Sequence, residues 1–246
     1  LILKENFELS DLTVDVASVK DVYNQIEDDL KDSYSMLGDS RRNAEAGRPN
    51  RGSVVALWAE VYLSEAGWPL KETAKYALAA EKAKEVIDNK AKWGFDWEDS
   101  YDVLYGLYQK INGINKEDIF TIPCNKANGN TINAMYGFWA YPGELGGWDV
   151  VFSELTFFNE FPDGVRKDAT FNYTVTKEDG TVIPWQDLKY KRPYYKKLMK
   201  SDKAPNYYAY DSSIPMRMLR FTQTALTYAE AKARTTDGPD ALAYQC

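Results

Sequence analysis

Residues 51–89 decide the fold, and they read RGSVVALWAEVYLSEAGWPLKETAKYALAAEKAKEVIDN. The first part, residues 53–66, is apolar on nearly every side at helical spacing. A helix without a polar side has no surface suited to contact with solvent, so we expect this one to be buried. Gly67 and Pro69 then mark a turn, because glycine commonly ends a helix and proline cannot continue one.

A second helix follows this turn and is apolar on one side only. Its apolar stripe consists of Tyr76, Ala80, Ala83 and Ile87, and charged residues fill the opposite side. Small alanines where two helices cross, with aromatic rings between them, are typical of a tetratricopeptide-type pair. The sequence therefore predicts a mainly α fold, built on tetratricopeptide-like helical hairpins with long loops and minor β-strands.

Other elements are predicted from shorter patterns. A first helix is expected over residues 19–37, with Ser18 as its N-cap and Gly38 at its end. Residues 125–150 show no clear period, which predicts a long loop. The two cysteines, Cys124 and Cys246, give no disulfide framework. The remaining predictions are helices over residues 101–110 and 152–161, a strand over 117–124, a hairpin turning at Asp179-Gly180 and a last helix over 222–235.

Two further segments carry motifs of a known family. They are FPDGVRKDATF at residues 161–171, and MLRF at residues 218–221 followed by LTYAEA at residues 226–231. A cluster of glycine and arginine precedes the helical pair, at Gly47, Arg48, Arg51 and Gly52. Taken in order with the helical pair, these motifs resemble those of the SusD/RagB family, which are nutrient-binding lipoproteins on the outer surface of certain Gram-negative bacteria.

The resemblance implies one SusD/RagB-like domain, incomplete at both ends. Its helical part would cover residues 18–110 and 214–246, and its loop-rich part residues 117–213. It also implies a glycan-binding lipoprotein on the exterior of the outer membrane, held by a lipid on a residue that this chain does not contain. Such a protein captures oligosaccharide and delivers it to a TonB-dependent SusC-like transporter. Some family members bind peptides, so a peptide ligand stays open.

Composition argues against several other classes of protein. The net charge of −7 and the pI of about 4.9 argue against nucleic acid, which attracts basic surfaces. No apolar run approaches the roughly 20 residues that a membrane-spanning helix needs. The chain has no histidine, which excludes a Ser-His-Asp triad, a Cys-His dyad and a zinc site that uses histidine. No pair of acids is set apart for glycoside hydrolysis, so we expect neither an enzyme nor a metal or other cofactor.

The aromatic residues are concentrated in the loop-rich part. Of 35 in the chain, 18 lie between Tyr136 and Tyr210. Loops lie on the surface and carry function, and an aromatic plane suits the C–H face of a sugar, whose hydroxyls seek amides and acids. We therefore expect displayed rings of residues 125–150 to hold ligand, with asparagines supplying hydrogen bonds. The leading candidates are Trp139, Tyr141, Trp148, Asn130 and Asn133, with Trp185 and Tyr208 in second rank.

The alternative for each ring is that it fills the core beneath a long loop, as large rings often do. The tryptophans among or beside the predicted helices are assigned to packing: Trp58, Trp68 and Trp93. Three motif residues are expected to order the backbone through ion pairs rather than to touch ligand: Asp163, Arg166 and Arg220. A helical-repeat scaffold that binds only protein is the third functional alternative, and the long aromatic loops argue against it.

Overall fold

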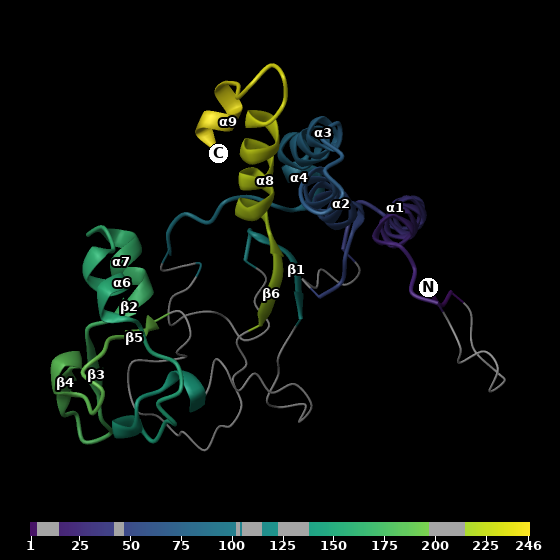
Figure 1. Ribbon diagram of the computed structural model, residues 1–246. Coiled ribbons are helices and arrows are strands. Elements are labelled where there is room, and N and C mark those ends of the chain that lie inside the picture. Colours follow the sequence, from purple (N-terminus) through teal and green to yellow (C-terminus); the bar gives the residue numbers. More distant parts are fainter. Residues whose placement is uncertain (4–14, 42–46, 102–103, 105–114, 123–137, 197–214) are drawn as a thin grey trace. The chain divides into compact units, whose positions relative to one another are not determined.

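Residues from both ends of the chain make one compact unit, and the middle of the chain makes another. Unit 1 is Leu1–Asp96 with Leu219–Cys246, and unit 2 is Trp97–Met218. Figure 1 shows their helices and strands in a computed structural model of the chain. The structure describes residues 1–3, 15–41, 47–101, 104, 115–122, 138–196 and 215–246.

Unit 1 is built from helices. Their bounds are α1 Val19–Met36, α2 Arg51–Ala66, α3 Lys75–Asp88, α4 Lys90–Trp93, α8 Phe221–Ala233 and α9 Ala241–Gln245. Helices α2 and α3 form the predicted hairpin, and α8 packs along α3. Helix α2 also contacts α1, so it lies at the centre of the unit.

Helix α2 is buried, as its apolar sequence predicts. Val55, Ala56 and Ala59 are completely buried. Helix α3 contributes its own small residues to the same core, namely Ala79, Ala83 and Val86. Small side chains let two helix backbones approach closely, which explains why alanine recurs at helical spacing in both helices.

The start of α2 lies two residues before its predicted position, because Asn50 caps it. The Asn50 side chain accepts the Ser53 N–H over 3.0 Å, and the Ser53 hydroxyl accepts the Asn50 N–H over 3.3 Å. This reciprocal pair satisfies two backbone donors at the helix end. A Cβ on Gly52 would lie 2.5 Å from the Trp93 ring, so only glycine fits there. The glycine of the motif thus makes room for a buried tryptophan.

The first and last long helices of unit 1 match their predictions within two residues. The Ser18 side chain caps α1 by accepting the Asp21 N–H over 3.0 Å. Its C-cap is Leu37 rather than Gly38, because Leu37 already turns into an extended conformation. Helix α8 begins at Phe221, one residue before its predicted start.

Trp68 corrects one of the three packing assignments. Trp58 and Trp93 are buried as predicted, but the Trp68 side chain is 82% exposed. It lies beyond the end of α2, in the turn that leads to α3. The Lys71 ammonium lies over the Trp68 ring, 5.1 Å from its centroid, in a cation–π contact. The sequence pattern did not distinguish a residue in the turn from one in the helix.

Unit 2 combines short helices with short strands. Its helices are η5 Phe138–Ala140, η6 Gly143–Leu145, α6 Leu155–Glu160, α7 Val165–Thr170 and η7 Trp185–Asp187. Its strands are β1 Asp118–Ile122, β2 Phe171–Asn172, β3 Thr174–Thr176, β4 Val182–Pro184, β5 Tyr194–Tyr195 and β6 Met216–Arg220, the last of which runs into unit 1. In the described ranges these strands pair as β1 with β6, β2 with β5 and β3 with β4.

The predicted hairpin is confirmed. Strands β3 and β4 are antiparallel, with Val175 opposite Ile183. The turn between them uses Gly180 at a φ of 85°, and the Asp179 carboxylate accepts the Thr181 N–H over 2.8 Å. Glycine adopts this left-handed conformation without the strain that a Cβ would add.

The mainly α fold with minor strands is therefore confirmed. Three parts of these predictions lie outside the described residues: most of the helix over residues 101–110, residues 125–137 of the loop, and Cys124. No helix in the described part of the chain is long and apolar enough to span a bilayer.

Candidate functional site

The tryptophan loop, residues 138–151, is closed by hydrogen bonds between its two ends. The Val150 N–H donates to the Trp139 carbonyl over 3.1 Å, and the Asp149 N–H donates to the Tyr141 carbonyl over 3.2 Å. The loop between these bonds contains η6. Its ends are thus held side by side, as in a short two-stranded ribbon.

Gly147 allows this closure. A Cβ at Gly147 would lie 2.0 Å from the Tyr141 carbonyl oxygen, a distance that no real side chain tolerates. The Gly147 N–H also donates to the Pro142 carbonyl over 3.0 Å. Glycine at this position therefore lets the chain cross close to its own backbone.

Asp149 fixes the loop to the core of unit 2. Its carboxylate accepts the Gly143 N–H over 2.8 Å and the hydroxyl of buried Tyr194. Burial, and then the Asp149 carboxylate, raise the pKa of Tyr194 well above its usual range, so this hydroxyl keeps its proton. The Asp149 carboxylate thus holds the loop closed and bonds it to the core.

The loop displays two of the three predicted rings. The Trp139 side chain is 37% exposed and the Trp148 side chain 53% exposed. Each indole offers an apolar face and one N–H donor, the combination that suits a partly hydrated ligand. A loop fixed by backbone hydrogen bonds also presents these rings with little entropy left to lose on binding.

Tyr141 corrects the expectation that all three rings are displayed. Its side chain is only 2% exposed. It belongs to a hydrophobic core with Ala140, Leu145, Val175, Leu188 and Tyr194. The ring therefore packs beneath the loop instead of being displayed from it. Tyr141 thus has the core-filling role that was the alternative for each ring.

The other predicted site residues separate into two groups. Trp185 is half-buried in η7, packs against the same core and lies edge-on to Phe158 with ring centroids 5.5 Å apart. The remaining three predicted residues lie outside the described residues, so their roles stay predictions: Asn130, Asn133 and Tyr208.

Two comparisons with known proteins give no match, since neither a family model nor a curated protein matches the chain. Solved structures do match. A SusD superfamily protein from Parabacteroides distasonis matches 93% of this chain with a TM-score of 0.72 and 22% identity. A laminarin-binding SusD-like protein matches 98% with a TM-score of 0.75 and 21% identity. A structure with a xylogluco-oligosaccharide matches 87% with a TM-score of 0.62 and 23% identity.

The chain has the SusD-like fold. It spans about half the length of these structures: 49%, 56% and 45% of the respective chains. The fold expected from the three motifs is thereby confirmed.

One motif segment of this SusD-like fold uses a different ion pair from the expected one. The Asp163 carboxylate lies 2.9 Å from the ammonium of Lys167, four residues further on. Among the described residues, the Arg166 guanidinium has no hydrogen-bond or ion-pair partner, so the expectation that Arg166 orders the backbone is corrected. Lys167 forms the ion pair of this segment instead; its side chain is buried, with its ammonium 4.9 Å from the centroid of the Phe158 ring.

Sequence reasoning missed Tyr190 as a further exposed ring. Tyr190 is exposed and stacks on Phe152, with ring centroids 5.3 Å apart and planes 19° apart. The N–H of the preceding residue, Lys189, donates to the Glu144 carboxylate over 2.6 Å. This bond joins the segment around Tyr190 to the tryptophan loop. No local pattern marks this pairing, because the bond joins residues 45 positions apart.

Proposed function

We propose that this chain belongs to a surface lipoprotein of the outer membrane that binds glycan. The protein captures oligosaccharide and delivers it to a TonB-dependent SusC-like transporter. Among the matched structures, one is named for binding laminarin and one contains a xylogluco-oligosaccharide, which supports a glycan ligand. The transporter partner and the lipid anchor are proposed from the SusD/RagB resemblance of the sequence motifs.

The observation that carries the proposal is the pair of exposed indoles on a closed loop. Trp139 is 37% exposed and Trp148 53% exposed, while the backbone that carries them is bonded at Trp139, Tyr141 and Asp149. A sugar ring packs its C–H face on such a plane and bonds its hydroxyls to nearby polar groups. The backbone hydrogen bonds already order the backbone of the loop, so less of the contact free energy is lost to ordering it on binding.

A binding screen on the full-length protein tests the ligand class. Neutral oligosaccharides, including laminarin fragments and xyloglucan fragments, are compared with acidic oligosaccharides and with peptides. The proposal predicts affinity for an oligosaccharide that Trp139→Ala and Trp148→Ala both weaken. Binding of peptides alone would replace the glycan proposal with the peptide-binding alternative.

Recovery of the native protein tests the proposed partner. Membranes are solubilised and the protein is purified, and the proteins that accompany it are identified. The proposal predicts an outer-membrane, TonB-dependent transporter in the purified material. Recovery as a free monomer from the cytoplasm would contradict both the location and the partner.

A further inference from the structure

Unit 2 contains a cavity whose lining residues lie outside the tryptophan loop. It has a volume of about 790 Å³ and is lined by the end of α6, the start of α7 and the loop between them, with Tyr101 completing the wall. Ligand pockets for small molecules commonly have volumes of about 300–1,000 Å³. The cavity is thus large enough for one or more sugar rings.

Aromatic rings line the wall of this pocket and pack against a buried aromatic ring. Phe157 and Phe161 line it, and they meet edge to face with centroids 5.4 Å apart. Both also meet the ring of buried Phe171 edge to face, at 5.9 and 5.4 Å. Despite these contacts the Phe157 side chain remains 47% exposed. A fixed ring with an open face is a stacking surface rather than a core residue.

The rim of the pocket has charged side chains of both signs, which give it no net charge. Glu160 and Arg166 both line the pocket, and neither side chain has a hydrogen-bond or ion-pair partner in the described part of the chain. Asp163, also on the rim, is neutralised by Lys167 at 2.9 Å and stays largely exposed to solvent. One carboxylate and one guanidinium are therefore available to a ligand, at no net charge.

Gly164 sets the shape of the rim. Its φ of 137° and ψ of −176° belong to a region that is open essentially to glycine alone. This conformation places the start of α7 against the same cavity as the end of α6. Glu160 and Arg166, which flank the loop, thus reach one pocket.

We propose that this pocket is a second glycan site, which takes a neutral sugar ring. The aromatic wall takes the C–H face of the ring, Glu160 accepts hydrogen bonds from its hydroxyls and Arg166 donates to them. Because the rim carries no net charge, it offers an acidic sugar no excess of positive charge to pair with. A peptide that adds a strand is disfavoured, since no strand lines the pocket. The ligand class rests on the proposed function, whereas the location of the site does not.

The test compares two sets of variants of the full-length protein on one panel of neutral and acidic oligosaccharides. Glu160→Gln, Arg166→Gln and Phe157→Leu alter the pocket, and Trp139→Ala with Trp148→Ala removes the rings of the tryptophan loop. Glu178→Gln is the matched control, because Glu178 is an exposed acid of unit 2 that does not line the pocket. Thermal unfolding of each variant checks that it is folded.

The second site predicts that the double tryptophan variant keeps residual affinity for a neutral oligosaccharide. Phe157→Leu or Arg166→Gln should weaken this residual affinity roughly tenfold, and Glu178→Gln should not. If the double tryptophan variant has no residual affinity, or if the pocket variants leave that residual affinity unchanged, the second site alone is overturned. Binding that only the pocket variants weaken would support it while overturning the role of the tryptophans. A wild-type protein that binds no oligosaccharide would overturn both.

Discussion

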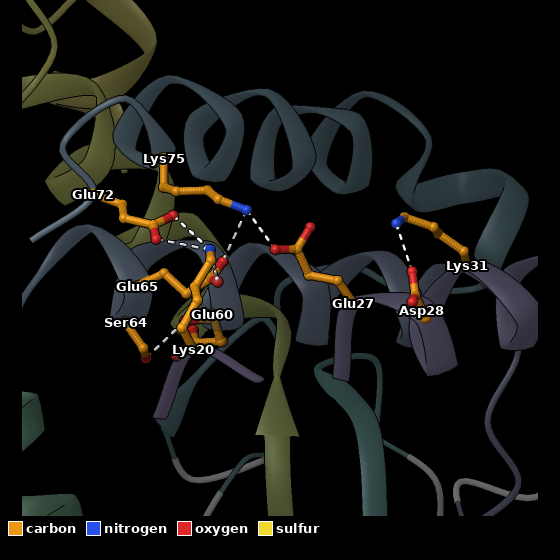
Figure 2. A network of polar contacts seen from close by, with 9 residues as sticks. All are labelled: Lys20, Glu27, Asp28, Lys31, Glu60, Ser64, Glu65, Glu72 and Lys75. Carbon is orange, nitrogen blue, oxygen red and sulfur yellow. Dashed lines mark hydrogen bonds and ion pairs between the residues drawn. The ribbon is translucent and has the colours of Figure 1, made fainter. Parts of the chain in front are cut away.

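The ammonium of Lys75 on α3 lies 3.1 Å from the carboxylate of Glu65 on α2, and the Glu65 side chain is completely buried. Figure 2 shows that Lys75 also reaches Glu27 of α1. Lys20 of α1 lies 2.7 Å from Glu72 and 3.6 Å from Glu65. Burial opposes the charge on Lys75, but its hydrogen bond to Glu27 and its ion pair with Glu65 outweigh burial and raise the pKa of this lysine. The network thus ties α1 to the helical hairpin.

Lys75→Met should lower the free energy of unfolding by about 3–5 kcal/mol, because it leaves a buried carboxylate without its closest partner. The measurement is urea unfolding of the full-length protein, followed by the circular dichroism of its helices. The loss should appear as a lower midpoint with an unchanged slope, since the surface exposed on unfolding stays the same.

Lys31→Met is the matched control for this variant. Lys31 pairs with Asp28 at 2.8 Å on the exposed side of α1, where water screens both charges. Its replacement should leave the unfolding midpoint nearly unchanged. Equal losses for Lys31→Met and Lys75→Met would show that burial of the network contributes nothing to the stability of unit 1.

Tyr173 should make the protein less stable in alkali. Its hydroxyl donates to the Asp168 carboxylate over 3.0 Å, and burial together with this bond raises the pKa of Tyr173 from 10.0 to about 12. A raised pKa contributes stability that is fully present below the unfolded value and is lost as the pH rises toward the folded value. Tyr173→Phe should therefore flatten the decline of the unfolding midpoint between pH 10 and 12. An identical decline in both proteins would contradict this assignment.

Gly147→Ala should open the tryptophan loop. The new methyl group would lie 2.0 Å from the Tyr141 carbonyl oxygen, which is backbone and cannot rotate away. Forced repacking of this kind costs about 1–3 kcal/mol. Gly38→Ala is the control, because a Cβ there meets nothing within 4 Å. We expect Gly147→Ala to reduce glycan affinity and Gly38→Ala to preserve it, as measured by calorimetric titration. Unchanged affinity in both variants would mean that loop closure does not shape the site.

The sequence predicts the elements of unit 1 well because each depends on local periodicity. The apolar sides of α2 and α3 and the Ser18 cap are patterns within a few residues. The position of Gly52 against Trp93 is different, since it joins residues 41 positions apart in the chain. Sequence alone shows that both residues are present, but not that one makes room for the other.

The tryptophan loop shows the same limit for the candidate site. Composition indicates that rings are displayed from the loop, and Trp139 and Trp148 are exposed. Tyr141 is buried because it packs with Val175, Leu188 and Tyr194, which are distant in the chain and which no period or motif places beside it. Exposed and buried rings occur within ten residues of one another here, and only the tertiary packing distinguishes them.

The most direct test of the account is the affinity and stability of Trp148→Ala, with Trp68→Ala as control. Trp68 is an exposed tryptophan of unit 1 with no proposed role in ligand binding. Stacking on the order of 1 kcal/mol or more per ring corresponds to roughly tenfold in affinity. We predict that Trp148→Ala weakens oligosaccharide binding by about this factor with little change in unfolding free energy, and that Trp68→Ala changes neither. A loss of about 3–5 kcal/mol of stability in Trp148→Ala without a specific loss of affinity would contradict the account, because it is the result expected of a core ring.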